Sequence, residues 1–159
     1  MEYTQILTEQ DGPVRIITWN RPDKLNAITP QLEIEFRDAC LAADKDPSVK
    51  VIIVRGAGRC FSAGYDLSGS YTTERVWPGG LPKGVDVGEF LDGYRNTLKR
   101  SWDNQYLFAE MDKPVIGQVH SWCMGGGTWY ALSTDILCCS DDAVFAQPEV
   151  RNINGISFV

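Results

Sequence analysis

The chain has 159 residues, of which 43% are hydrophobic and 23% are charged, a balance typical of one soluble globular domain. The formal net charge of -6 argues against nucleic acid as the main partner, because phosphate contacts need clustered Lys and Arg. No apolar run approaches the roughly 18 residues of a membrane span, and the five cysteines lack zinc-binding spacing, so we expect a cytoplasmic protein with reduced thiols and no metal site.

The first predicted element is a β-hairpin. Residues 3–8 and 13–19 are β-rich runs, and Asp11-Gly12 between them is a strong turn signal. Arg21-Pro22 then bars regular structure, because the residue before a proline avoids the helical conformation. The chain is therefore expected to leave the hairpin in a loop.

A helix is predicted from Thr29-Pro30 to Asp46-Pro47. Threonine is a favoured N-cap and proline is favoured at the first helical position, whereas the second proline ends the helix. Apolar residues recur at helical spacing and predict one buried face, formed by Leu32, Phe36, Ala39, Cys40 and Ala43.

The middle of the chain predicts two strands, separated by a long loop and a helix. The β-branched run Val51–Val54 predicts a strand buried on both faces, and residues 114–119 predict a second strand. Residues 68–88 are rich in Gly, Ser, Thr and Pro and predict a variable surface loop. Apolar residues at helical spacing over 87–102 predict a helix that continues to about residue 110.

The last third of the chain predicts a turn, a short helix and two strands. Residues 124–127 form a tight turn into a helix that passes through Leu132. Residues 135–140 predict a buried strand, which would bury the adjacent pair Cys138-Cys139, and residues 144–146 predict another strand. The order of these elements is typical of a layered α/β domain.

Two glycine-bearing turns, at 61–67 and 122–127, are candidate sites because each follows a strand. Such turns can direct successive backbone N–H groups away from the sheet, and glycines let another atom approach closely. A tight connection without a ligand would explain either turn alone. Together, N–H groups from two loops can converge on one oxygen that gains negative charge, which is an oxyanion hole.

Three stretches of the sequence resemble the enoyl-CoA hydratase/isomerase (crotonase) family, in the family's order. They are residues 19–28 (WNRPDKLNAI), 61–67 (FSAGYDL) and 124–127 (MGGG), the last followed by 145–150 (FAQPEV). The resemblance implies an α/β fold, the family's crotonase-type spiral of ββα units, usually assembled as trimers or pairs of trimers. The C-terminal helical part of that fold is absent here, so residues 1–159 are expected to be the N-terminal part of a longer family domain.

The resemblance also implies roles for individual residues. The backbone N–H groups of Tyr65 and Gly126 would hold the thioester oxygen, and Glu149 would be the acid/base residue. Coenzyme A would arrive as part of an acyl-CoA thioester substrate, so no separate cofactor is expected. The residues implied to bind substrate and coenzyme A are Lys24, Leu25, Ala27, Ala63, Gly64, Asp66, Leu67, Met124, Gly125 and Trp129.

Trp129 departs from the pattern of the hydratases, which carry two glutamates: the first would stand at this position, and the second corresponds to Glu149. Two carboxylates share the work of deprotonating water and protonating the α-carbon, and an indole can do neither. Moving a double bond needs only one base, which Glu149 could supply. The sequence therefore favours an isomerase slightly over a hydratase.

Two other interpretations remain open. Decarboxylation, thioester hydrolysis and C–C bond cleavage use the same pair of backbone donors with a different acid/base residue. A non-catalytic acyl-CoA-binding scaffold would fit both the loss of the first glutamate and the short chain.

Overall fold

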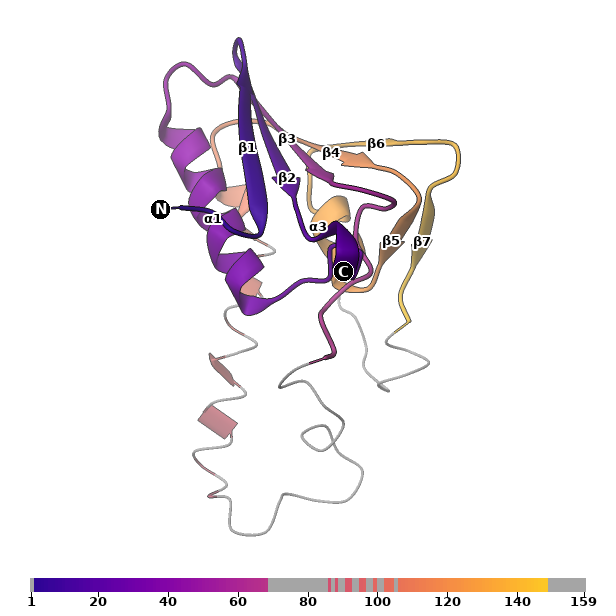
Figure 1. Cartoon of the computed structure of the whole chain (residues 1–159). Helices are drawn as coiled ribbons and strands as arrows, with labels where there is room; N and C mark the ends of the chain where they lie inside the picture. The colour runs from indigo at the N-terminus through magenta and orange to yellow at the C-terminus, as the bar shows by residue number, and fades with distance from the viewer. Residues whose placement is uncertain are drawn as a thin grey trace.

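Figure 1 shows the computed structural model of the chain. It describes residues 2–68, 102–104 and 106–148, together with positions 86, 88, 91, 92, 95, 96 and 99. The predicted loop over 68–88 therefore lies outside the described residues except at positions 68, 86 and 88. Glu149 lies outside them as well.

A five-stranded sheet forms the centre of the fold. Its strand order is β1-β2-β3-β4-β6, in which β1 runs antiparallel to β2 and the remaining neighbours are parallel. This mixed sheet with its helices confirms the predicted α/β class. The strands are β1 (Ile6–Asp11), β2 (Val14–Trp19), β3 (Val51–Gly56), β4 (Val115–Val119) and β6 (Ile136–Cys139).

The helix α1 spans Pro30–Lys45, as the sequence predicts. The hydroxyl of Thr29 accepts a hydrogen bond from the backbone N–H of Leu32 at 3.1 Å, so it is the N-cap, and Asp46 is the C-cap. All five residues of the predicted apolar face are buried. The helix packs against β1 and β2.

The hairpin forms at the predicted place, with Gly12 in its turn at φ 53°. Its first strand begins at Ile6 rather than at residue 3. The backbone N–H groups of Thr4 and Gln5 donate to the carboxylate of Glu35 on α1 at 2.7–3.1 Å, so the helix holds this segment in place of the neighbouring strand.

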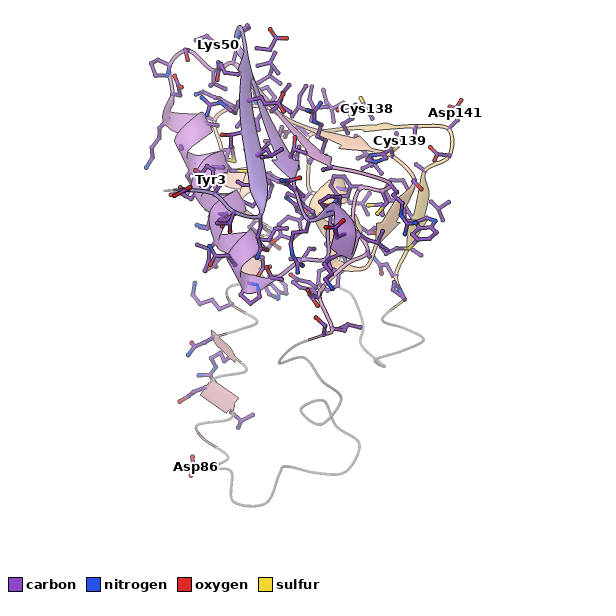
Figure 2. The ribbon with its side chains drawn as sticks, viewed as in Figure 1. Tyr3, Lys50, Asp86, Cys138, Cys139 and Asp141 are labelled. Atoms are coloured by element: carbon purple, nitrogen blue, oxygen red, sulfur yellow. The ribbon has the colours of Figure 1, made fainter. Side chains whose placement is uncertain are left out.

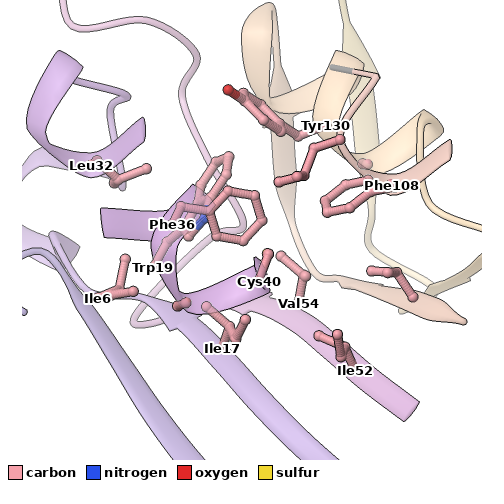
Figure 3. Packing of buried hydrophobic residues seen from close by; sticks show 14 of the residues in the cluster. Ile6, Ile17, Trp19, Leu32, Phe36, Cys40, Ile52, Val54, Phe108 and Tyr130 are labelled. Carbon is pink, nitrogen blue, oxygen red and sulfur yellow. The ribbon is translucent and has the colours of Figure 1, made fainter. Parts of the chain in front are cut away.

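The core joins α1 to α3, the short helix at Gly126–Leu132 that follows the second glycine turn. Trp19 on β2 is fully buried, and its ring lies 5.5 Å from that of Phe36 on α1 and 5.3 Å from that of Tyr130 on α3 (Figure 3). Both helices therefore cover the same face of the sheet. Edge-to-face ring pairs of this kind add about 0.5–1.5 kcal/mol beyond the area that they bury.

Two predictions of burial are wrong. Along β3, buried residues alternate with half-buried ones, so only one face of this strand enters the core. On β6, Cys138 and Cys139 are exposed (Figure 2). Two features of the sheet account for these errors: the described helices cover a single face of it, and β6 is the last strand in its order.

A second, two-stranded sheet continues from the carboxyl end of β4. In it, β5 (Trp122–Met124) pairs in parallel with β7 (Val144–Ala146). The sequence predicts β7 but places residues 122–124 in the turn, because three residues before a glycine run carry little strand signal.

The predicted helix over 87–110 is only partly present. The described positions between 88 and 104 are helical, but the chain bends at Tyr106, and Phe108–Glu110 is a separate 3-10 turn, η2. A second such turn, η1, spans Pro22–Lys24 after the hairpin. Among the helices that the structure describes, none has the length and apolar character needed to cross a bilayer.

Candidate active site

Both glycine-bearing turns lie at one edge of the main sheet. The strands β3 and β4 are parallel neighbours, so their carboxyl ends meet at the same edge (Figure 1). The chain leaves β3 toward residues 61–67 and leaves β4 toward residues 122–127. Ligands of parallel α/β sheets commonly bind outside the carboxyl ends of the strands.

The early loop, residues 20–28 after β2, runs alongside the first glycine turn. Ile28 forms a parallel bridge with Tyr65, and the backbone N–H of Ala63 donates to the carbonyl oxygen of Leu25 at 2.9 Å. Two of the three stretches that suggested the family are therefore hydrogen-bonded neighbours, although they are far apart in the sequence.

The first glycine turn also lies beside β5, the strand that pairs with β7. Ser62 forms a parallel bridge with Cys123, and the backbone N–H of Gly125 donates to the carbonyl oxygen of Ala146 at 2.8 Å. The segment that precedes Glu149 in the sequence is thus bonded to the second glycine turn.

Glycines bring the two turns into close contact. Gly64 has a φ of +90°, and a Cβ added to it would lie 3.0 Å from the carbonyl oxygen of Met124 and 3.5 Å from the backbone nitrogen of Gly126. A Cβ added to Gly126 would lie 2.6 Å from Cε2 of Tyr65. The structure therefore places Tyr65 and Gly126 side by side, while their role as an oxyanion pair stays a prediction.

The early loop is held in an unusual backbone conformation. Leu25 and Asn26 both have a φ of 52°, in the left-handed region that few side chains adopt. The buried amide of Asn26 donates to the carbonyl oxygens of Ala57 and Cys60 at 2.8 and 3.0 Å, and its oxygen accepts from the backbone N–H of Arg21. These bonds compensate for the strained conformation and fix the loop against the chain that follows β3.

Asp66 also holds the early loop. Its carboxylate pairs with the Arg21 guanidinium at 3.0 Å, and that guanidinium also donates to the carbonyl oxygen of Ala27. Hydrogen bonds from the hydroxyl and backbone N–H of Ser68, followed by the charge of Arg21, lower the pKa of Asp66 to about 2. Asp66 is therefore ionised at neutral pH and bridges two of the family stretches.

The site predicted from the sequence omits one buried glutamate, which the structure places beside the turns. Glu33 on α1 is 1% exposed, and its Oε1 accepts hydrogen bonds from the hydroxyls of Tyr65 and Tyr130, each at 3.0 Å. Burial, and then the charge of Glu33, raises the pKa of Tyr130 well above its ordinary value, so its hydroxyl stays protonated and donates. The only signal in the sequence is that Glu33 borders the apolar face of α1, three residues before Phe36.

Trp129 stands beside the proposed oxyanion residues. Its ring centroid lies 6.0 Å from that of Tyr65, and its buried Nε1 has no hydrogen-bond partner among the residues that the structure describes. The other predicted contacts of coenzyme A differ in exposure, and their role stays a prediction: Lys24 and Leu67 are exposed, whereas Leu25, Ala27, Ala63 and Met124 are partly buried. In the described part of the chain, no three His, Cys, Asp or Glu residues are grouped as metal ligands.

Comparison with known proteins identifies the family. The sequence model of the enoyl-CoA hydratase/isomerase family matches residues 9–153. The chain belongs to the enoyl-CoA hydratase/isomerase (crotonase) family, as the three sequence stretches predict.

Similar proteins carry more than one reaction in their names. A Mycobacterium bovis protein named as a probable enoyl-CoA hydratase is 32% identical over 151 residues, which are 95% of this chain and 52% of that protein. The peroxisomal Delta(3,5)-Delta(2,4)-dienoyl-CoA isomerase of Arabidopsis thaliana is 35% identical over 142 residues, which are 88% of this chain and 49% of that protein.

The fold is shared with solved structures of the family. The crystal structure of an enoyl-CoA hydratase/isomerase from Xanthobacter autotrophicus Py2 matches with a TM-score of 0.81 at 33% identity, over 94% of this chain and 51% of that chain. This match confirms the predicted crotonase-type fold. The chain spans about half the length of the curated relatives that it matches.

Proposed function

We propose that this chain carries the enolate-stabilising part of an acyl-CoA enzyme. The backbone N–H groups of Tyr65 and Gly126 would donate to a thioester carbonyl, whose oxygen gains negative charge when a proton leaves the adjacent carbon. The observation that supports this proposal is the close approach of the two turns, in which Gly64 lies against Gly125 and Gly126 with little room for a side chain. Such an approach would bring N–H groups from two loops within reach of one carbonyl group.

Isomerisation is proposed ahead of hydration as the reaction. A base would remove a proton from C2 of a 3-enoyl-CoA to form a dienolate, and would return that proton at C4, so that no water is consumed. Glu149 is the proposed base. Trp129 supports this choice. Its indole lies beside Tyr65, and by resemblance to the family it would occupy the position of the first hydratase glutamate. An indole cannot activate water.

The proposed partner is an acyl-CoA thioester, with no separate cofactor and no nucleic acid. Lys24 is exposed in the early loop and would meet a phosphate of coenzyme A, while the segment from Ala63 to Leu67 would line the path of coenzyme A. By resemblance to the family, we also propose a homotrimer or a pair of trimers in the cytoplasm.

The reaction is tested by incubating the protein with a 3-enoyl-CoA and following the absorbance of the conjugated 2-enoyl product. The wild-type protein is expected to turn over this substrate. Glu149→Gln should lower turnover by about 10²- to 10⁴-fold, because one general base is lost, and should leave coenzyme A binding intact. Glu110→Gln, at an exposed glutamate, is the matched control and should leave turnover unchanged.

Other outcomes would redirect the proposal. Turnover of 2-enoyl-, β-ketoacyl- or hydroxyacyl-CoA without isomerisation would favour a hydratase, or a decarboxylase, thioester hydrolase or C–C lyase. Binding of acyl-CoA with no turnover of any of these thioesters would contradict catalysis and favour a scaffold. The presence of Trp129 at the position of the first hydratase glutamate is the reason for testing this alternative.

A further inference from the structure

One carboxylate oxygen connects the two glycine turns. Oε1 of Glu33 accepts a hydrogen bond from the hydroxyl of Tyr65 at 3.0 Å and a second from the hydroxyl of Tyr130 at 3.0 Å. Tyr65 belongs to the first turn, and Tyr130 lies on α3, the helix that begins in the second turn. A single atom on α1 therefore holds a side chain from each half of the proposed oxyanion site.

The surroundings of Glu33 are not those of an ordinary acid. Glu33 and Tyr130 are each 1% exposed, and the ring of Tyr130 lies 5.3 Å from that of Trp19 and 5.7 Å from that of Phe36 (Figure 3). Glutamate is almost never buried to this extent unless it is paired or hydrogen-bonded. Replacing a buried polar group and its hydrogen-bond partners with apolar groups of the same shape can be nearly neutral or stabilising, so packing alone does not explain the residue.

We propose that Glu33 is a positioning residue, which fixes the distance between the backbones of the two glycine turns by holding Tyr65 and Tyr130 on one oxygen. The inference rests on the proposed function, because the distance that matters is the one between the N–H groups of Tyr65 and Gly126.

The side chain of Tyr65 carries this constraint between the turns. Its ring lies over Gly126, where an added Cβ would come within 2.6 Å of Cε2, and its centroid is 6.0 Å from that of Trp129 on the same helix. With its hydroxyl bound to Glu33 and its ring packed against α3, the side chain cannot rotate without breaking a contact. Tyr130, four residues after Gly126, anchors the same helix to the same oxygen.

Glu35 provides a matched comparison on the same helix. It is 0% exposed, but its carboxylate accepts hydrogen bonds from Thr4, Gln5 and Gln31, none of which belongs to a glycine turn. The helix α1 therefore carries two buried carboxylates, of which one holds the proposed site and the other holds the N-terminal segment.

Two thioester probes separate positioning from general stability. Acetoacetyl-CoA binds an oxyanion site as its enolate, which is detected by near-ultraviolet absorbance, whereas butyryl-CoA binds as a neutral thioester. The affinities of the protein for both are measured by calorimetry, and the ratio of the two affinities is the readout. A purely structural role would change both affinities together, while a misplaced donor would weaken only the enolate.

The expected effects follow from the hydrogen bonds around Glu33 that each variant keeps. Glu33→Leu removes both hydrogen bonds and should weaken acetoacetyl-CoA binding about 10- to 100-fold, because a displacement of a donor by about 1 Å can cost that much. The affinity for butyryl-CoA should stay within about 2-fold of wild type. Glu33→Gln keeps an acceptor oxygen and should recover most of the loss. Tyr130→Phe keeps the ring, loses one hydrogen bond and should weaken acetoacetyl-CoA binding about 3-fold or more. Glu35→Gln should lower the melting temperature without changing the ratio.

Each negative result has a distinct meaning. If the wild-type protein does not bind acetoacetyl-CoA as an enolate, the proposed function itself fails. If the wild type binds it but Glu33→Leu leaves the ratio unchanged, or Glu33→Gln loses as much as Glu33→Leu, the positioning role is refuted. Should Glu33→Leu not fold, Tyr130→Phe decides, because its core ring is retained, and an unchanged ratio in that variant refutes the role.

Discussion

The ring of Tyr65 occupies the space in which a side chain at Gly126 would lie. A Cβ at that position would be 2.6 Å from Cε2 and 2.7 Å from Cδ2 of the tyrosine. The φ of Gly126 lies outside the left-handed region, unlike that of Gly125 at 50°. The neighbouring ring, rather than the backbone conformation, therefore requires glycine at position 126.

Gly126→Ala is expected to displace Tyr65 and to weaken acetoacetyl-CoA binding about 10-fold, because the first turn moves away from the second. The affinity is measured by calorimetry. Gly12→Ala is the control: its φ of 53° should cost about 1–2 kcal/mol of stability, and no atom of the described residues lies within 4 Å of its added Cβ. Equal thioester binding by Gly126→Ala and wild type would contradict the contact.

Glu35→Ala is expected to lower the free energy of unfolding by about 3 kcal/mol, because it leaves the backbone donors of Thr4 and Gln5 without their acceptor. Chemical denaturation measures the change. Glu9→Ala removes an exposed partner of Arg55 at 3.3 Å and should cost no more than about 1 kcal/mol. Similar losses in both variants would mean that the N-terminal segment is not held by Glu35.

The stability of the fold should fall between about pH 4 and pH 2 as Asp66 is protonated. Its folded pKa of about 2 lies below the unfolded value of about 3.9, so its ionised form stabilises the fold above pH 4, and this contribution is lost as the pH falls through the folded pKa. Ser68→Ala removes the hydroxyl that lowers this pKa most and should raise it. A carboxyl-detected NMR titration measures the shift.

Ser48→Ala serves as the control for this titration. Ser48 donates to Asp46 through its hydroxyl and its backbone N–H, as Ser68 does to Asp66, and these bonds lower the pKa of Asp46. The control should raise the pKa of Asp46 and leave that of Asp66 unchanged. A pKa of Asp66 that is the same in wild type and in Ser68→Ala would refute the assignment.

Cys138 and Cys139 are expected to react first with a disulfide reagent such as DTNB, because they are exposed on β6, whereas Cys40, Cys60 and Cys123 are buried. Burial raises the pKa of all three buried thiols, and that of Cys123 to about 12, which removes the reactive thiolate at neutral pH. The fast phase should correspond to two thiols and should disappear in the double variant Cys138→Ser/Cys139→Ser. Five equally fast thiols would show that the core opens readily.

The sequence predicts the elements whose signals are local. Thr29 and Pro30 mark the start of α1, and the helical spacing of apolar residues marks its buried face, because capping and periodicity depend on neighbours in the chain. The exposure of Cys138 cannot be predicted in this way. An apolar run does not reveal whether a strand lies at the centre or at the edge of a sheet.

The candidate site likewise has one part that could be predicted from the sequence and one part that could not. Family resemblance was sufficient to select Tyr65 and Gly126, and the structure brings them together from separate turns. The bonds from Tyr65 and Tyr130 to Glu33 had no signal of their own, because hydrogen-bond partners that are distant in the sequence leave no spacing pattern. Pairing of this kind becomes visible only when three elements are packed together.

The parallel order of β2, β3 and β4 has a consequence for how the protein is made. Two parallel strands can pair only after the crossover segment between them has been synthesised. Most contacts of this sheet therefore join distant parts of the chain, and such topologies fold slowly. The second glycine turn is hydrogen-bonded to Ala146 on β7, the last strand that the structure describes. On the ribosome, the edge of the sheet that carries the two glycine turns would therefore be completed after the strands that precede it.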